Sequence, residues 1–328
     1  MSTGRSPRVV VLAGGYGGAK LSHGVALASA AREAAGEAPL DLRVIVNTGD
    51  DLELHGLAVS PDLDTVMYTL AGLANDETGW GVRDETWSTK AMLERYGAET
   101  WFGLGDRDLA THLHRTQLRR EGLSLTAATA QLCARLEVPA QLLPMTDDEV
   151  RTQIRTPDGW LEFQEYFVKR GQADEVLEIR RLGIEEARPT TQVLAAVAEA
   201  ELIVIAPFNP FVSVGTILAL SGMLEALLGA PAPIVAVSPV VGGAALRGPA
   251  DKMHRSLGGT ASAAGVVVHY RQTYPGLVDT FVLDEVDAAE APALEASGAG
   301  IELQPTVMRT YDDRRVLAQL ILDGHLHA

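Results

Sequence analysis

Residues 8–20 read RVVVLAGGYGGAK, and this stretch decides the fold. Its first part is a short run of apolar residues, which is typical of a strand buried on both faces of a sheet. Four glycines follow between positions 14 and 18, and an alanine-rich helical pattern then continues to about Ala34. A buried strand that passes through glycines into a helix predicts the first unit of a nucleotide-binding α/β sheet.

Similar apolar runs recur farther along the chain, each followed by a loop and a helical pattern. They occupy Leu42–Val46, Leu202–Ala206 and Ile234–Val237, and we expect a further strand at 279–283 and a terminal helix at 311–323. Strands that alternate with helices form parallel βαβ units. The predicted fold class is therefore α/β, with a Rossmann-like, open and mostly parallel sheet.

The middle of the chain differs in composition from its flanks. All four tryptophans lie between positions 80 and 160, and short strands are expected at 150–183. With 328 residues the chain exceeds the usual size of about 100–200 residues for one domain. We predict a Rossmann-like nucleotide-binding core of residues 1–75 and 186–328, and a mainly helical insertion with short strands over 76–185. The expected helices of this insertion cover 84–96, 106–120 and 126–136.

The charge balance excludes two classes of partner. The chain has 27 Lys and Arg against 43 Asp and Glu, a formal net charge of −16. Because general nucleic-acid binding needs a basic face, and so does docking on an anionic membrane, we expect neither partner. The single cysteine, Cys133, excludes an internal disulfide framework and favours a reducing, cytoplasmic location.

The loop after the first strand is the first candidate binding site, because ligands of open α/β sheets bind outside the carboxyl ends of the strands. Gly14, Gly15, Gly17 and Gly18 let a ligand approach the backbone, and Lys20 follows at the start of the helix. This combination predicts a site for phosphate or nucleotide. It matches neither the dinucleotide fingerprint nor the P-loop, which needs Ser or Thr after the lysine. The alternative is a tight turn without a ligand.

Four aspartates form the second candidate site. Asp50 and Asp51 follow the second apolar run, and Asp62 and Asp64 stand at the start of the next helical pattern. Such carboxylates repel one another unless a cation lies between them, and Mg²⁺ takes one or two carboxylates while water and phosphate oxygens complete its shell. The alternative is a set of helix N-caps.

The remaining candidates lie in the second half of the chain and on one helix. Asn209 and Ser213 follow a predicted strand, where an amide can bind a nucleotide base, although an ordinary turn is the alternative. Arg247 can bind phosphate with two hydrogen bonds, or it is a solvated surface arginine. His112 and His114 are two apart on a predicted helix and therefore do not make a two-histidine metal site.

Six motifs together resemble a known family. In chain order they are VVVLAGGYGGAKLSHG, VNTGDDLELHGLAVSPDLDTVMYTL, GWGVRDETW, WFGLGDRDLATHLHRTQ, IAPFNPFVSVGTIL and SPVVGGAALRGPAD. They resemble the 2-phospho-L-lactate transferases of deazaflavin coenzyme (F-420) biosynthesis, including the phosphoenolpyruvyl-type enzymes. The resemblance covers about residues 8–255 and continues more loosely to the end.

The resemblance implies a magnesium-dependent transfer onto the deazaflavin 7,8-didemethyl-8-hydroxy-5-deazariboflavin, called Fo. The donor is a three-carbon acid joined through a diphosphate to guanosine, and GMP leaves when the terminal ribityl hydroxyl of Fo attacks. The metal carboxylates map onto Asp50 and Asp62, and Asp50 or Asp51 is the candidate base. The deazaflavin contacts map near Asp50 and Thr89, with Trp87 beside them. We also expect a homodimer.

Two positions depart from the family pattern. Phe208 stands where serine is common, and Ala244 stands where lysine is common. We expect the two residues to share one wall of the nucleotide crevice, so the transferred acid stays open between lactate, enolpyruvate and glycerate. The rival hypothesis is a regulatory protein of the related superfamily branch, which binds a nucleotide sugar without turnover. An NAD-dependent oxidoreductase is a weaker third possibility, because the dinucleotide fingerprint fails.

Overall fold

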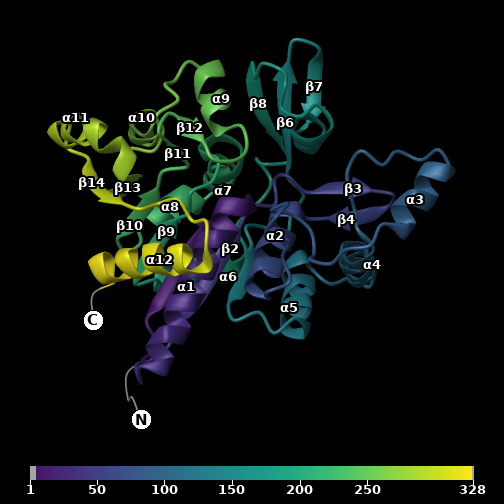
Figure 1. The fold of residues 1–328 in the computed structure, drawn as a ribbon, viewed down its shortest axis with the longest axis horizontal. Coiled ribbons are helices and arrows are strands. Elements are labelled where there is room, and N and C mark those ends of the chain that lie inside the picture. The colour runs from purple at the N-terminus through teal and green to yellow at the C-terminus, as the bar shows by residue number, and fades with distance from the viewer. Residues whose placement is uncertain (1–4, 327–328) are drawn as a thin grey trace.

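The computed structural model describes residues 5–326, and its centre is a seven-stranded parallel sheet. The strand order is β14-β13-β10-β9-β1-β2-β5 (Figure 1). This arrangement confirms the predicted α/β class with a Rossmann-like sheet. The strands of this sheet are β1 (Arg8–Ala13), β2 (Asp41–Val46), β5 (Gln141–Pro144), β9 (Leu202–Ile205), β10 (Ile234–Val237), β13 (Thr280–Asp284) and β14 (Gly300–Gln304).

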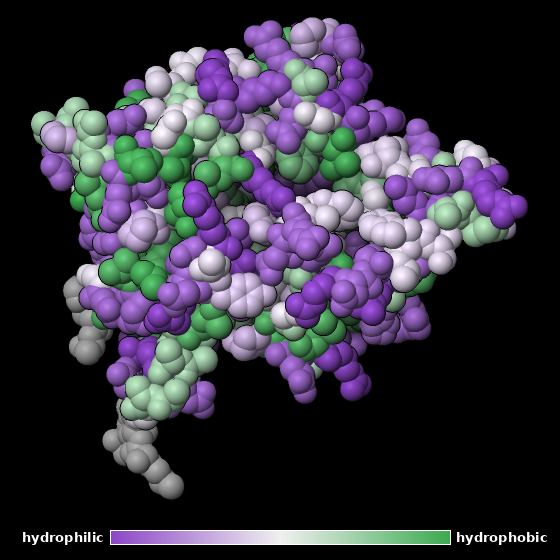
Figure 2. Space-filling model, viewed as in Figure 1, coloured by the Kyte–Doolittle hydropathy of each residue, from purple (hydrophilic) through white to green (hydrophobic). Residues whose placement is uncertain are grey.

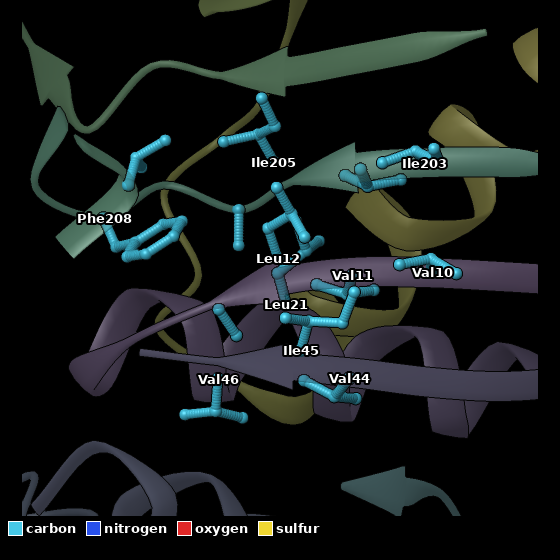
Figure 3. Close-up of a cluster of buried hydrophobic side chains, with 14 of the residues drawn as sticks. Val10, Val11, Leu12, Leu21, Val44, Ile45, Val46, Ile203, Ile205 and Phe208 are labelled. Atoms are coloured by element: carbon cyan, nitrogen blue, oxygen red, sulfur yellow. The ribbon is translucent and has the colours of Figure 1, made fainter. Parts of the chain in front are cut away.

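Strand β1 lies at the centre of the core. Its residues from Val9 to Ala13 are fully buried, as expected for a run of apolar side chains with neighbours on both sides. Val11 pairs with Val44 of β2 and with Val204 of β9. Figure 3 shows the side chains of these three strands packed together, with the Phe208 ring at the end of the cluster.

The strand order reverses between β1 and β9. From β1 the chain proceeds to β2 and β5 on one side, and from β9 it proceeds to β10, β13 and β14 on the other. The loops after β1 and β9 therefore leave the sheet in opposite directions and open a crevice between them. In open parallel sheets this reversal is where ligands bind.

Helices cover the sheet, and the longest of them, α1, contacts both α2 and α12. Figure 1 shows α12 crossing α1. The helices of the core are α1 (Gly15–Ala34), α2 (Pro61–Leu70), α6 (Thr191–Glu199), α7 (Gly215–Ala219), α8 (Met223–Leu228), α9 (Ala250–Ser256), α10 (Ala263–Thr273), α11 (Ala291–Ala296) and α12 (Tyr311–His325), with the single-turn segments η2 (Pro210–Val214) and η3 (Glu285–Glu290).

The segment 76–185 contains helices and a small antiparallel sheet of order β7-β6-β8. One of its strands departs from the expected insertion, because β5 pairs with β2 in the central sheet. Sequence reasoning also missed β14 and two hairpins, β3–β4 and β11–β12. The other elements of this segment are α3 (Ser88–Arg95), α4 (Asp106–Arg120), α5 (Leu125–Arg135), β6 (Arg151–Thr156), β7 (Gly159–Glu162), η1 (Glu165–Lys169) and β8 (Glu178–Leu182). The two hairpins lie outside it and consist of β3 (Leu52–Leu54) with β4 (Leu57–Val59) and of β11 (Val240–Val241) with β12 (Ala244–Ala245).

The surface is mixed in character. Figure 2 shows polar and apolar residues interspersed over one face of the molecule. Within residues 5–326, no helix combines the length and the apolar character needed to cross a membrane.

Candidate active site

A cavity of about 910 Å³ lies at the carboxyl ends of the central strands. The loops after β1, β2, β9, β10 and β14 form its core side, and residues of the segment 76–185 form the opposite side. A cavity of this size suits a ligand of drug size or larger. It brings together most of the predicted site residues, namely Gly14, Gly15, Gly17, Lys20, Asp50, Asp62, Asn209, Ser213 and Arg247.

The glycines after β1 are required by close packing at the crevice. A Cβ added to Gly17 would overlap the carbonyl oxygen of Pro207, in the loop after β9. A Cβ on Gly14 would lie 2.8 Å from the Asp62 carboxylate and 2.8 Å from the Phe208 ring. Only glycine fits these positions, because such distances are too short for carbon contacts. The two loops are thus held against each other.

Gly18 serves the fold more than the cavity. A Cβ on it would lie 3.0 Å from Ala13, so this glycine brings α1 close to β1, and it is not among the residues that line the cavity. Gly15 adopts a positive φ of 54°, which favours glycine. Its amide donates a hydrogen bond to Asp62 Oδ1 at 2.7 Å, so the loop and this carboxylate are directly joined.

Asp50 and Asp62 form the acidic centre of the cavity. Asn47 Nδ2 donates to Asp50 Oδ2 and to Asp62 Oδ2, each at 3.0 Å, and Asn47 Oδ1 is fixed by the amide of Gly49. Burial raises the pKa of Asp62 to about 6. Burial raises the pKa of Asp50 well above its usual value, and the neighbouring Asp62 charge raises it further. Two carboxylates are therefore held close together by one side-chain amide that donates to both.

The two carboxylates fit a bound cation. Asp50 Oδ1 is buried without a hydrogen-bond partner, although a carboxylate oxygen normally has one. Mg²⁺ takes one or two carboxylates and completes its shell with water and phosphate oxygens. Among residues 5–326, no cluster of three or more His, Cys, Asp or Glu suits a metal ion. A site of this kind would therefore depend on ligands from the substrate.

Asp51 and Asp64 lie apart from this centre. Asp51 does not line the cavity, accepts a hydrogen bond from Ser60 Oγ at 2.6 Å, and has its pKa raised to about 7 by burial. Asp64 is bound by Arg115, whose two terminal nitrogens each donate to one carboxylate oxygen. Of the four aspartates predicted as one site, only Asp50 and Asp62 are joined by a shared partner.

Cations gather at another part of the cavity. Lys20 lies 4.2 Å above the ring of Tyr16, and the Arg247 guanidinium lies 4.5 Å from the same ring. Lys20 Nζ donates to the backbone carbonyl of Met308 at 2.5 Å, and burial lowers its pKa to about 8. Arg309 also lines the cavity. This arrangement, which we call the cationic end (Lys20, Arg247 and Arg309), is suited to an anion.

The loop after β9 has a structural duty as well as a place in the cavity. Asn209 Oδ1 accepts from the amides of Phe211 and Val212, and Nδ2 donates to the sulfur of Met253. The side chain of Asn209 is therefore used as a cap, which favours the turn over base recognition. Ser213 is buried and also lines the cavity.

The two departures from the family pattern occupy different surroundings. Phe208 is buried and lines the cavity beside Gly14. Ala244 is exposed on β12 and is not among the lining residues. The expected common wall is thus not formed by these two residues.

Aromatic side chains form a further wall. Those that line the cavity are Trp80, Trp101, Phe102, Phe163 and Phe167. Phe163 and Phe167 lie parallel, with ring centroids 5.5 Å apart. Flat apolar faces of this kind suit a planar ring system. We call these five residues the aromatic wall.

The predicted deazaflavin residues lie beside this wall. Trp87 contacts Trp80 edge to face at 6.2 Å and does not itself line the cavity. The Thr89 amide donates to Asp106 Oδ1 at 3.0 Å, at the start of α3, and the next residue, Lys90, lines the cavity. The prediction for Thr89 and Trp87 thus concerns residues one step behind the cavity surface.

Sequence reasoning missed two groups of lining residues. One is the loop 306–309 after β14, because that strand was not predicted. The other consists of Tyr68, Asp108 and His112, all of which are buried and line the cavity. A signal for the second group was present, since Asp108 and His112 are four residues apart and therefore share one face of a helix.

Comparisons with known proteins show which family the sequence matches. A family profile described as 2-phospho-L-lactate transferase CofD matches residues 9–305. The chain is 46% identical over 321 residues to a phosphoenolpyruvate transferase of Streptomyces griseus, covering 96% of this chain and 98% of that protein. It is 44% identical over 320 residues to a phosphoenolpyruvate transferase of Kitasatospora aureofaciens, covering 96% and 97%.

The fold is also similar to that of a solved structure. A crystal structure of a UPF0052 family member from Bacillus halodurans superimposes with a TM-score of 0.64 at 16% identity, covering 97% of this chain and 100% of that one. At this identity the likeness concerns the fold alone.

Proposed function

Since the chain belongs to the 2-phospho-L-lactate transferase CofD family, we propose that it transfers the phosphoenolpyruvyl group of a guanosine diphospho-acid to Fo and releases GMP. In this reaction the terminal ribityl oxygen of Fo forms a bond to the phosphorus next to the acid. The bond between that phosphorus and the oxygen bridging to GMP breaks, and the hydroxyl proton is lost. The product is a phosphodiester that joins the three-carbon acid to the deazaflavin, as the F-420 pathway requires.

The observation that carries this proposal is the meeting of three chemistries in one cavity. The cationic end suits a diphosphate, the aromatic wall suits a flat ring, and Asp50 and Asp62 line the same cavity. Phosphoryl transfer depends on positioning and charge neutralisation rather than on a covalent nucleophile. The cavity has no cysteine among its lining residues, and Cys133 is buried elsewhere.

Asp50 and Asp62 are the residues that would hold Mg²⁺. When bound, the ion neutralises charge on the diphosphate and lowers the pKa of the attacking hydroxyl. The chain's own contribution is to fix the two carboxylates through Asn47 and the Gly15 amide, so that their spacing is set before substrate arrives. Lys20 and Arg247 add positive charge beside Tyr16 in the same cavity.

Asp50 is the better placed of the two candidate bases. It lines the cavity, whereas Asp51 lies behind it against Ser60. A carboxylate that lines the cavity can accept a proton from a hydroxyl held within hydrogen-bond distance. We assign Asp50 to accept the hydroxyl proton. The Asp51 charge acts on Asp50 from outside the cavity lining.

The choice of enolpyruvate as the transferred acid rests on the relatives. Two proteins similar over nearly the whole chain carry the name phosphoenolpyruvate transferase. Phe208 is consistent with this choice, because its buried ring presents an apolar face where serine would offer a hydroxyl. A planar enolpyruvyl group has no hydroxyl to satisfy there, whereas a glyceryl group has one.

The test is a coupled assay that identifies the product by mass. A guanylyltransferase supplies the donor from phosphoenolpyruvate, 2-phospholactate or 3-phosphoglycerate, and Fo and Mg²⁺ are added with the protein. We expect the phosphoenolpyruvyl product to form fastest, and Asp50→Asn to form almost none. A faster reaction with another acid would overturn the choice of acid. Binding of a nucleotide sugar with no transfer from any donor would support the regulatory alternative instead.

A further inference from the structure

A buried polar network lies on the wall of the cavity formed by α2 and α4. It contains Asp64 and Tyr68 of α2, and Asp108, His112 and Arg115 of α4. All five residues are buried, and all except Arg115 line the cavity. Polar groups so deeply buried must have their hydrogen bonds satisfied by one another or by a ligand.

The donors and acceptors of this network can be assigned by starting from Arg115 and Tyr68, which have known donor groups. Arg115 has only donors, so we assign His112 Nδ1, 3.4 Å from Arg115 Nη1, as the acceptor of that contact. With this tautomer His112 carries its hydrogen on Nε2, which lies 3.2 Å from Asp108 Oδ1 but is not aligned for a hydrogen bond. Tyr68 donates its hydroxyl to the same Asp108 oxygen at 2.8 Å.

Both protein donors thus approach Asp108 Oδ1 and leave Oδ2 without one. Among the described residues, no hydrogen bond reaches Asp108 Oδ2, and this oxygen is not among the buried atoms sealed from solvent. Because Asp108 lines the cavity, Oδ2 is an acceptor available to a ligand there. The Tyr68 hydrogen bond fixes the carboxylate, and the His112 ring lies beside the same oxygen.

The charge of this wall selects the ligand group. Arg115 is committed to Asp64, and Lys90 on neighbouring α3 lies 3.9 Å from Glu94. A carboxylate repels phosphate and accepts from an O–H group. The cationic end, formed by loops of the core, is instead suited to the anionic donor substrate.

We propose that Asp108 Oδ2 binds a ribityl hydroxyl of the acceptor, so that the α2–α4 wall holds the acceptor while the cationic end holds the donor. This inference rests on the proposed function. It makes Asp108 a specificity-determining residue, and it makes His112 and Tyr68 positioning residues that act through it. The hydroxyl concerned is one that does not react.

The test compares Fo with analogues that each lack one of the non-reacting ribityl hydroxyls. Affinity is measured by fluorescence titration without donor, for wild type, Asp108→Ala and Asp108→Asn. A charge-assisted hydrogen bond of this type contributes about ten- to a hundredfold in affinity. We expect Asp108→Ala to weaken Fo binding by that factor, and to have no further effect on the one analogue that lacks the contacted hydroxyl.

This comparison separates the contact from damage to the fold, because any structural effect of the substitution acts equally on Fo and its analogues. Asp108→Asn preserves the shape and is the second variant should the alanine protein fold poorly. GDP affinity should stay unchanged in both. Asp158→Asn is the matched control, since Asp158 is exposed in the β6–β7 turn and does not line the cavity.

The outcomes are distinct. If Asp108→Ala weakens the binding of Fo and of every deoxy analogue by the same factor, the hydroxyl contact is wrong. If the loss of affinity disappears only for an analogue whose ring N–H is methylated, Asp108 contacts the ring instead. Wild type that fails to bind Fo at all would overturn the proposed function and this inference with it. A rise in the KM for Fo in Tyr68→Phe, smaller than in Asp108→Ala and without a change in the donor KM, would support the positioning role of Tyr68.

Discussion

Asp62 and Asp64 stand two residues apart on one helix, and the structure predicts opposite effects when each becomes asparagine. Asp64 neutralises the buried Arg115, so Asp64→Asn leaves a buried cation without its partner. Breaking such a pair costs about 3–5 kcal/mol. Asp62 has no cation beside it, and its close neighbour is a second carboxylate, Asp50.

The cost of the Asp62 charge follows from its pKa. Burial raises this pKa from 3.8 to about 6, which corresponds to about 3 kcal/mol of unfavourable ionisation energy at pH 7.5. Asparagine removes the charge but loses the bond from Asn47, since two amide NH₂ groups then face each other, and this returns about 1 kcal/mol. We expect the metal-free Asp62→Asn protein to be as stable as wild type or up to about 2 kcal/mol more stable.

Urea unfolding followed by circular dichroism in EDTA measures both effects. The gain in Asp62→Asn should shrink as pH falls below 6 and vanish at about pH 4.5. An aspartate whose folded pKa is raised stabilises the protein at low pH, and this contribution is lost as pH rises through about 6. Turnover of Asp62→Asn with Mg²⁺ should nevertheless fall about a thousandfold or more. Equal destabilisation in both variants, or full turnover in Asp62→Asn at saturating Mg²⁺, would refute the separation of roles.

Three further predictions follow from the structure of the cavity. Gly17→Ala should destabilise the protein by about 1–3 kcal/mol in thermal unfolding, because the added Cβ meets the Pro207 carbonyl. The control is Gly324→Ala in α12, where no atom lies closer than 4.0 Å and the substitution should stabilise the protein by about 0.4–1 kcal/mol. Equal effects of the two substitutions would contradict the close packing of the loops after β1 and β9. GDP affinity, measured by calorimetry, should fall as pH rises through about 8, because Lys20 of the free protein loses its proton there. The Lys20→Met variant should bind GDP weakly at every pH. A wild-type GDP affinity that does not change with pH would show that Lys20 does not bind the phosphates. Trp80→Leu should weaken Fo binding about tenfold by loss of ring contact, and Trp87→Leu should weaken it less; the reverse order in a fluorescence titration would place the ring on Trp87.

The strands that could be predicted from the sequence are those in which a continuous apolar run is also buried in the structure. β1 is apolar from Val9 to Ala13 because it has a strand on each side and is buried, and β9 and β10 are apolar for the same reason. β14 was missed because it is an edge strand, has no buried residue and contains Glu302. β5 was missed because only a few residues, Gln141–Pro144, form it.

The site was predictable where one loop carries the signal and not where the fold assembles it. Glycines and aspartates beside a strand end are visible in sequence. The partner of Asp64 is not, because Arg115 lies 51 residues away and reaches it only through the packing of α2 against the segment that follows. Tyr68 and Asp108 meet for the same reason, and neither residue alone distinguishes a cavity wall from an ordinary core.

The central claim is that one cavity holds donor and acceptor together for direct transfer, and GMP release measured with and without Fo tests it most directly. With purified protein, Mg²⁺ and guanosine-diphospho-enolpyruvate, we expect one GMP for each phosphoenolpyruvyl-Fo formed, no GMP when Fo is omitted, and an unchanged intact mass of the protein. GMP release without Fo accompanied by a mass increase of the protein, or no GMP when both substrates are present, would contradict it.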